Sequence, residues 1–572
     1  MFFLKKRINL FGFTALILLI LPTFALGQKM ATKTPQYGGT FTTIGHTIMS
    51  WDPGIDANPH TSYVFEQLGF GDWSKPRDEC PMTIDYMGID CGTTQVAERY
   101  EIEDPETMVF YLRKGVNFHN KPPVNGRELT AEDVVYSFHK MLGIGSGFSE
   151  ATPQGKGAWG SFEIKSVEAR DKYTVVFKHK PSIHLENHFL TQSNADRIYP
   201  KEIGDLTDWK QHVGTGAWQI KDYQEGNSIT WEKNPDYWGS YELDPQYKLP
   251  FLDQVRWLII KDKATQMAAI RTGQIDHIGK SNTAALTAEE YNQLKKTTPD
   301  IQKKSWWLES WALGFLFDDP NHPWADLRVR QAMQMAMNAQ ELSSEYYQGH
   351  VPPIIWPSLG ESAAEFITPL SEMAKNTRDA YEYNPEGAKR LLAEAGYPNG
   401  FKTSIIASRQ EQDWNIVQIA SGYLRDIGIE AEIIEMEWGD FFKMAISNEG
   451  YEMYYGWAAV NIDPMLWAKL QFDPRSEGCC IYNGLKDPTM EILMDSAYNA
   501  QTREAYVKAM KAASSRWTEQ HYQVTLLPGV NFEVWHPYIG GFQGEVTMGL
   551  MREGSVYARI WIDQELKKEM GF

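Results

Sequence analysis

Residues 401–436 constrain the fold most strongly, because their pattern changes from strand to helix and back to strand. Phe401–Ala407 and Glu430–Met436 are typical of strands, residues 412–426 are typical of a helix, and Gly428 lies in the turn. A unit of this kind pairs parallel strands and covers them with the connecting helix. Similar alternation recurs through the second half of the chain. We therefore expect an α/β fold whose sheets are covered by helices.

Helix-capping residues mark several further elements. Thr130 and Asp133 form a capping box at the start of a predicted helix. Asp262 is expected to cap a helix that Gly273 ends, and Asn384-Pro385 begins another helix. The chain has 572 residues, which is more than one hydrophobic core normally holds. Two or more packed lobes are therefore expected.

The first 27 residues resemble an export signal. A basic start with Lys5, Lys6 and Arg7 precedes an apolar stretch from Leu10 to Leu21, and Ala25-Leu26-Gly27 fits a signal-peptidase site. We expect cleavage after Gly27 and export to the periplasm or to the outer face of the cytoplasmic membrane. An uncleaved N-terminal anchor is the alternative, because the apolar run is nearly long enough to span a bilayer.

The net charge narrows the possible partners, and the cysteines indicate the compartment in which the protein works. The formal net charge of −19 disfavours nucleic acid, whose phosphates would be repelled. Cys80 and Cys91 are placed to close a short loop by a disulfide, which suits an oxidising compartment. For the adjacent Cys479 and Cys480, free thiols and pairing elsewhere both remain open.

Catalytic and cofactor motifs are missing from the sequence. It contains no GxSxG elbow, no HExxH pair and no P-loop. The glycines between Gly143 and Gly147 lack the dinucleotide-binding spacing and indicate a loop. His184 and His188 are four residues apart, but we interpret them as surface histidines rather than metal ligands. We expect no enzyme activity, no metal and no cofactor.

Aromatic residues are abundant, with 20 Trp and 28 Tyr. Trp306, Trp307 and Trp311 lie close together, and Trp438 and Trp457 flank another segment. Such rings pack in cores and between lobes, but they also line clefts that bury a ligand of variable shape. Both interpretations stay open for each tryptophan.

Many short motifs together carry a resemblance to a known family. The chain resembles the extracytoplasmic solute-binding proteins of the peptide/nickel ABC importers, the group that includes dipeptide- and oligopeptide-binding proteins. The matching segments are Val96–Tyr100, Tyr111–His119, Leu129–Phe138, Val213–Trp218, Asn234–Gly239, Leu252–Val255, Gly273–Asp276, Asp326–Ala332, Gly396–Gly400 and Glu437–Phe441.

This resemblance implies a two-lobed fold of the periplasmic-binding-protein type, which closes on its ligand like a Venus flytrap. Lobe I would be discontinuous and take residues 37–70, 200–300 and 525–572. A small inserted domain would take residues 71–199, and the other major lobe, lobe III, would take 301–524. Chain crossings near 300 and 525 would form the hinge.

The resemblance also implies a ligand site, at which this sequence departs from the family. Peptide-binding members carry an aspartate after a Gly-Trp pair, and that aspartate binds the amino terminus of the peptide. Here Val460 occupies its position, in the stretch that begins at Gly456-Trp457. A valine cannot neutralise an ammonium group, and burying that group without a partner costs several kcal/mol.

Three interpretations of Val460 follow. The ligand lacks a free amine at this point, as a blocked peptide, an opine-like compound or an oligosaccharide would. Alternatively, Asp463 takes over the role, or the alignment is locally shifted. A fourth alternative is that Val460 only packs in the core and contacts no ligand. Ala458 and Asn461 complete the candidate segment.

Three residues outside that segment are further candidates for the ligand site. Dipeptide-binding members place an arginine on the carboxylate of the peptide. A gap-free match puts that position at Ala407, but Arg409, two residues on, is close enough to supply a bidentate contact; a solvated surface arginine is the alternative. Met49 and Trp51 follow the first strand, in a region that borders the cleft in the family.

The sequence therefore predicts a monomeric receptor that captures peptides or similar small solutes and delivers them to an ABC permease. A receptor for an oligosaccharide or a metal chelate is the alternative within the same fold. A secreted hydrolase would need a nucleophile and a base in a cleft, and the sequence gives no sign of them. A sensor that presents its ligand to a membrane partner is not distinguished from a transporter.

Overall fold

The structure, a computed structural model, describes most of the chain after residue 29. The described residues are 30–31, 34–48, 50–55, 59–82, 88–145, 147–153, 155–156, 162–182, 184–192, 196–279, 285–409, 414–447, 449–459, 464–475, 485–545 and 553–572. The expected export signal therefore lies outside the described residues, as do Cys479 and Cys480. Among the described residues, no helix combines the length and the apolar character needed to cross a bilayer.

One mixed ten-stranded sheet runs through the molecule in the order β14-β13-β15-β12-β16-β11-β1-β10-β9-β8. In chain order its strands are β1 (Thr40–Ile44), β8 (Trp218–Gln224), β9 (Ser228–Lys233), β10 (Gln254–Leu258), β11 (His277–Ile278), β12 (Gln302–Phe315), β13 (Phe401–Ser408), β14 (Ile429–Met436), β15 (Met453–Ala459) and β16 (Gln523–Trp535).

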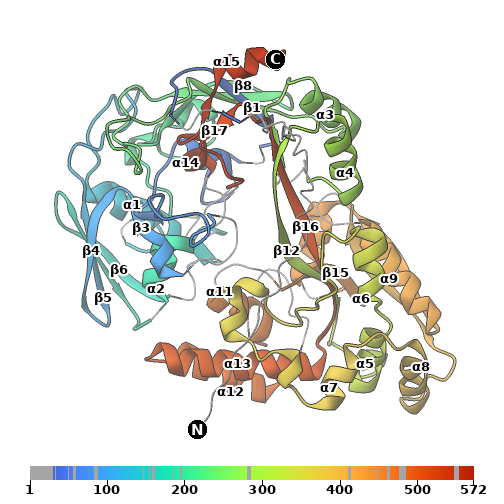
Figure 1. Cartoon of the computed structure of the whole chain (residues 1–572). Coiled ribbons are helices and arrows are strands. Elements are labelled where there is room, and N and C mark those ends of the chain that lie inside the picture. The colour runs from blue at the N-terminus through green and yellow to red at the C-terminus, as the bar shows by residue number, and fades with distance from the viewer. Residues whose placement is uncertain are drawn as a thin grey trace, which may run out of the picture.

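Two long antiparallel strands, β12 and β16, connect the two halves of this sheet (Figure 1). We call them the crossing strands. The first lobe contains β1 and β8 to β11, and the second lobe contains β13 to β15. The pairing of the crossing strands is irregular between Trp307 and Ala312, opposite Pro528. Proline has no N–H for a sheet ladder, so the regular pairing is interrupted there.

Helices cover both halves, as the α/β prediction requires. The first lobe carries α3 and α4, and α14 and α15 lie near the C-terminus; α5 to α13 belong to the second lobe (Figure 1). Their bounds are α3 (Lys263–Arg271), α4 (Ala288–Thr297), α5 (Leu327–Met335), α6 (Ala339–Glu341), α7 (Lys375–Ala380), α8 (Pro385–Glu394), α9 (Trp414–Asp426), α10 (Trp438–Ser447), α11 (Pro464–Phe472), α12 (Pro488–Tyr498), α13 (Arg503–Gln520), α14 (Glu553–Tyr557) and α15 (Gln564–Glu569).

The predicted strand–helix–strand unit is confirmed as β13, α9 and β14, with the two strands parallel. The predicted caps are also present. The side chain of Asp262 accepts a hydrogen bond from the backbone N–H of Thr265, and Asn384 accepts one from that of Gly387.

Gly400, just before β13, is the tightest point of this unit. Its φ is +72°, and a Cβ there would lie 1.8 Å from the carbonyl oxygen of Gly428. We expect Gly400→Ala to lower the free energy of unfolding by at least about 3 kcal/mol, because left-handed strain and a backbone clash act together. Urea denaturation measures this loss. Gly396→Ala is the matched control, since Gly396 also has a positive φ (+98°) but no atom within 4 Å of the added Cβ. Equal losses in the two variants would contradict the clash.

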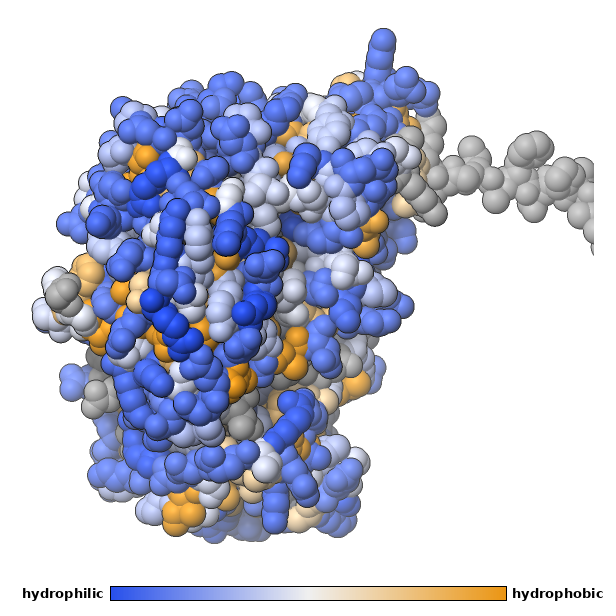
Figure 2. All heavy atoms as spheres, turned by 90° about the vertical axis from the view of Figure 1, so that its left-hand side faces the viewer, coloured by the Kyte–Doolittle hydropathy of each residue, from blue (hydrophilic) through white to orange (hydrophobic). Residues whose placement is uncertain are grey.

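A separate four-stranded sheet lies in residues 71–199, the segment expected to be an insert. Its order is β4-β5-β7-β6, formed by β4 (Ala97–Asp104), β5 (Thr107–Leu112), β6 (Ile164–Asp171) and β7 (Thr174–His179). Helix α1 (Ala131–Leu142) packs on it. Figure 2 views this side of the molecule, where hydrophilic residues predominate. The exposed ion pairs Arg170–Glu103 (2.7 Å) and Lys165–Glu106 (2.8 Å) belong to this sheet and its turns.

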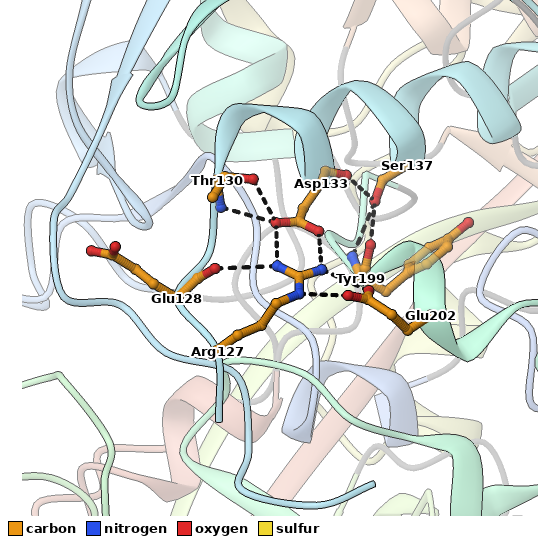
Figure 3. Close-up of polar contacts among 7 residues, drawn as sticks. All are labelled: Arg127, Glu128, Thr130, Asp133, Ser137, Tyr199 and Glu202. Carbon is orange, nitrogen blue, oxygen red and sulfur yellow. Dashed lines mark hydrogen bonds and ion pairs between the residues drawn. The ribbon is translucent and has the colours of Figure 1, made fainter. Parts of the chain in front are cut away.

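The start of α1 fastens the insert to the following chain (Figure 3). The Arg127 guanidinium donates hydrogen bonds to both carboxylate oxygens of Asp133 (2.9 and 2.6 Å), and it also contacts both oxygens of Glu202 (2.6 and 2.7 Å). The predicted capping box of Thr130 and Asp133 is present at the same point. Within the insert, Ser137 ties α1 to the last residue before that chain, because its hydroxyl accepts a hydrogen bond from the backbone N–H of Tyr199 (3.0 Å).

The insert and the first lobe share one hydrophobic core. A single cluster of buried side chains includes Phe110 and Phe138 of the insert together with Phe41, Trp218 and Ile562. The second lobe has separate clusters, one around Leu313 and Ile405 and another around α11 to α13. In packing terms, the insert is therefore an extension of the first lobe.

The predicted disulfide between Cys80 and Cys91 is present in the structure. It lies between two short paired strands, β2 (Gly69–Gly71) and β3 (Gly92–Thr94). In the same loop, the Arg77 guanidinium lies 2.9 Å from the carboxylate of Glu545. The loop is thereby fixed to the C-terminal part of the chain.

Candidate functional site

Strand direction identifies the edge of the second lobe at which a ligand would bind. Strands β13 and β14 are parallel, and β13 and β15 are parallel as well. Their carboxyl ends, at Ser408, Met436 and Ala459, therefore lie along one edge of the sheet. Ligands of open α/β sheets bind outside the carboxyl ends of the strands.

The first lobe has an equivalent edge. Strand β1 is parallel to β10 and to β11, so that Ile44, Leu258 and Ile278 end on the same side. Strand β11 is antiparallel to β16, and its residue Ile278 pairs with Val534. The carboxyl ends of the first lobe therefore point along the crossing strands toward the second lobe.

The two edges face each other across the middle of the crossing strands. Ala459, at the end of β15, pairs with Ser310 of β12. Trp307 and Trp306 continue β12 from that point toward the first lobe, where they pair with Val530 and Asn531 of β16. We call the space between the two edges the interlobe site.

Arg409 lies at the second-lobe edge, just after β13, but its guanidinium already has a partner. Its Nε and Nη2 donate hydrogen bonds to the two carboxylate oxygens of Glu435, at 2.9 and 2.8 Å. This pairing lowers the pKa of Glu435. The guanidinium also stacks 4.2 Å from the ring of Trp414. A ligand carboxylate could take these same two donors only in place of Glu435.

Trp51 lies near the first-lobe edge in a packed aromatic cluster. Its ring meets the rings of His60, His212 and Tyr223 edge-on, at centroid distances of 5.3, 5.2 and 4.9 Å. Its carbonyl oxygen accepts a hydrogen bond from Nε2 of His212 (2.8 Å). The structure therefore favours the packing interpretation of Trp51.

The histidines of this cluster are neutral because they are buried. Burial lowers the pKa of His212 to about 4, and it lowers the pKa of His60 well below its ordinary value. His46, which follows β1, has its pKa lowered to about 4 for the same reason. The sequence did not mark these residues, because isolated histidines give no sign of burial.

A buried acid was also missed by the sequence analysis. Glu533 of β16 is inaccessible to solvent and contacts Nε2 of His277. The other carboxylate oxygen of Glu533 accepts a hydrogen bond from Asn531 (2.9 Å), and His277 Nδ1 lies 2.8 Å from the hydroxyl of Thr43. This polar group joins β1, β11 and β16 immediately behind the first-lobe edge.

Several predicted site residues cannot be placed. Met49, Val460, Asn461 and Asp463 lie outside the described residues. The backbone of Trp457 and Ala458 is described as part of β15, at the second-lobe edge. The backbone therefore brings Trp457, Ala458 and Arg409 to one edge, and Trp51 lies near the edge that faces it.

The interpretation of His184 and His188 as surface residues is wrong. His188 is buried, with its ring 4.5 Å from that of Phe162, and the ring of His184 lies 3.9 Å from that of Tyr506. Their surroundings are aromatic. Within the described ranges, no group of three or more His, Cys, Asp or Glu side chains is arranged to hold a metal ion.

Together, the two facing edges and the crossing strands define an α/β binding protein of the two-lobed type. Comparison with known proteins identifies the family. Residues 93–477 match the bacterial extracellular solute-binding proteins of family 5. The chain belongs to this family.

Two curated relatives and one solved structure illustrate the relationship. Heme-binding protein A of Haemophilus influenzae is 27% identical over 482 residues, which cover 79% of this chain and 82% of the relative. The dipeptide-binding protein of Escherichia coli is 28% identical over 405 residues, covering 65% and 69%. An ABC transporter-associated periplasmic binding protein from Helicobacter pylori, solved with the peptide STSA, superposes with a TM-score of 0.70 at 22% identity, covering 92% of this chain and 99% of that one.

Proposed function

We propose that this solute-binding protein captures a small, peptide-like ligand in the interlobe site and delivers it to an ABC permease. The facing carboxyl ends of the two lobes carry the proposal, because a ligand between them contacts both lobes at once. A ligand with more contacts in the closed form shifts the protein toward closure. The chain itself makes or breaks no bond. The dipeptide-binding relative supports this assignment.

We propose the lobe boundaries expected from the sequence: 37–70, 200–300 and 525–572 for the first lobe, 71–199 for the insert and 301–524 for the second lobe. The crossing strands are the connections between the lobes. Their irregular pairing around Ser310 and Pro528 suits a hinge, since fewer ladder hydrogen bonds have to deform there.

Val460 determines the class of peptide-like ligand in this proposal. Without an acidic partner at this position, the ligand carries no free ammonium group there, as in a blocked peptide or an opine-like compound. Trp457, Ala458, Asn461 and Asp463 belong to the same candidate segment. Arg409, Met49 and Trp51 are the candidate contacts outside it, and Arg409 already pairs with Glu435 through Nε and Nη2.

A metal chelate is the second candidate ligand, and one observation favours it. Heme-binding protein A is a relative over most of both chains, and haem is an iron chelate without a primary amine. Such a ligand is also compatible with valine at position 460. An oligosaccharide would be compatible as well, because sugars stack on aromatic rings.

Native mass spectrometry of the protein purified from its own source tests the assignment. We expect a bound molecule of defined mass, with visible absorbance if it is haem. Thermal shift then tests the candidates one by one, because a ligand at a hundredfold excess over its Kd stabilises the folded state by about 2.7 kcal/mol. A protein that retains and binds no peptide-like, opine-like or chelate compound would contradict the proposal.

The cellular setting of the proposal follows from the sequence. The chain is exported by the signal in residues 1–27, acts outside the cytoplasm and works as a monomer. Its partners are the ligand and a permease in the cytoplasmic membrane. Size-exclusion chromatography with light scattering on the mature protein should give the mass of one chain.

A further inference from the structure

The two lobes touch directly beside the crossing strands. The side chain of Asn292 in α4 donates a hydrogen bond to Gln348 of the second lobe (2.7 Å). The ring of His350 packs edge-on against Phe532 of β16, with centroids 5.0 Å apart. These contacts lie next to the strands that connect the lobes, so a hinge motion would displace them little.

A second contact lies on the other side of the molecule from the crossing strands. The insert approaches the second lobe where α2 (Leu185–Asn187) faces α13 (Figure 1). His184, which immediately precedes α2, places its ring 3.9 Å from that of Tyr506 in α13, at an interplanar angle of 59°. The two residues are far apart in sequence, and they belong to opposite sides of the interlobe site.

The surroundings of this contact are those of a packed interface. Tyr506 is 2% exposed and also meets the ring of Phe366 edge-on, at 5.3 Å. Burial lowers the pKa of His184 to about 4, so that a neutral ring contacts Tyr506 at neutral pH. The positive charge of Arg503 nearby acts in the same direction.

We propose that the tilted ring contact of His184 with Tyr506 is a latch that holds the insert against the second lobe when the lobes are closed. The inference depends on the lobe closure of the proposed function. Because the insert shares its core with the first lobe, fixing the insert to α13 fixes the first lobe to the second. The interlobe site is then restrained on both sides, by the crossing strands and by the latch, and ligand exchange requires the latch to open.

Removing the ring of His184 tests the latch without any ligand. Loss of one aromatic contact should shift the ratio of closed to open molecules by a factor of about 2 to 10 toward the open form. We expect His184→Ala to increase the radius of gyration of the ligand-free chain in small-angle X-ray scattering. His184→Phe keeps a ring at this position and should retain the compact form.

His322→Ala is the matched control. The ring of His322 stacks 4.5 Å from that of Trp324, but both residues lie within the second lobe. This variant loses one aromatic ring contact of a histidine, stacked rather than tilted, and should leave the radius of gyration unchanged. If His184→Ala fails to fold, His184→Leu offers a second test, because it fills the space without a ring.

The proposed latch would be contradicted if neither His184→Ala nor His184→Leu increased the radius of gyration of the ligand-free protein relative to His322→Ala. That result would leave the transport assignment intact, since ligand binding is measured separately. Conversely, a protein that bound no candidate ligand could still show the expansion. The two proposals therefore fail in distinguishable ways.

Discussion

Val460→Asp should raise the affinity for dipeptides with a free amino terminus by on the order of a hundredfold. In the family pattern this position carries the acid that pairs with the amine, and a desolvated charge pair of this kind is worth about 2–5 kcal/mol. Each 1.4 kcal/mol corresponds to a tenfold change in Kd. Isothermal titration calorimetry with one dipeptide and its N-acetylated form measures the effect.

Val460→Asn is the control for this substitution. Asparagine has nearly the shape of aspartate but lacks its charge, so it should give little gain. The N-acetylated peptide should bind the aspartate variant no better than it binds the wild-type protein. An unchanged affinity for the free dipeptide would mean that residue 460 does not lie in the amine pocket. Strong binding of free dipeptides by the wild-type protein, abolished by Asp463→Asn, would transfer the role to Asp463.

Acidification below about pH 6.5 should destabilise the protein steeply. Burial lowers the pKa of His46, His119 and His212 to about 4, and that of His521 to about 3. In the unfolded chain a histidine binds its proton near pH 6.5. Between pH 6.5 and 4, the unfolded state therefore holds more protons than the folded state. The free energy of unfolding then decreases as the pH is lowered.

The free energy of unfolding should change steeply with pH, because several buried histidines act together. Each buried histidine contributes up to one proton, or about 1.4 kcal/mol per pH unit. A whole domain is stable by only about 5–15 kcal/mol, so the combined effect should unfold the protein well above pH 4. Urea denaturation at intervals from pH 7.5 to 4.5 measures the slope. His119→Gln should reduce this slope by about 1.4 kcal/mol per pH unit, the contribution of one proton. An unchanged slope would contradict the lowered pKa of His119.

Glu66 acts in the opposite direction and serves as an internal check. Burial raises its pKa to about 7, although Tyr237 and Trp238 donate hydrogen bonds to its carboxylate at 2.9 and 2.8 Å. The folded state thus binds a proton between pH 7 and 4.5 that the unfolded state does not hold. Glu66→Gln removes this compensation, and its stability should fall more steeply on acidification than that of the wild-type protein.

Local signals in the sequence were sufficient to predict individual elements. The unit of β13, α9 and β14 was identified because its strand pattern, its helix and Gly428 all lie within 36 consecutive residues. The caps at Thr130 and Asp262 are equally local, since each acts on the turn that follows it. The family motifs added the two-lobed arrangement, which no single segment encodes.

Contacts between distant segments could not be predicted in this way. His184 was taken for a surface residue, because nothing near it in sequence reveals that α13 covers it. The pairing of Glu533 with His277 likewise joins strands that are far apart along the chain. Arg409 was named as a candidate contact for a ligand carboxylate, and its position in the sequence did not reveal that the parallel pairing of β13 with β14 brings Glu435 beside it. Such partners emerge only once the order of the strands is known.

The hydrophobic core that the insert shares with the first lobe determines whether these two parts can move independently of each other. One buried cluster contains Phe110 and Phe138 of the insert together with Phe41 and Trp218 of the first lobe. Bending between the insert and the first lobe would expose apolar surface of this cluster to water. In the lobe motion that we propose, the insert therefore moves together with the first lobe, and opening has one principal degree of freedom. Any permease that recognises the shut conformation can then sense it from the insert as reliably as from either major lobe.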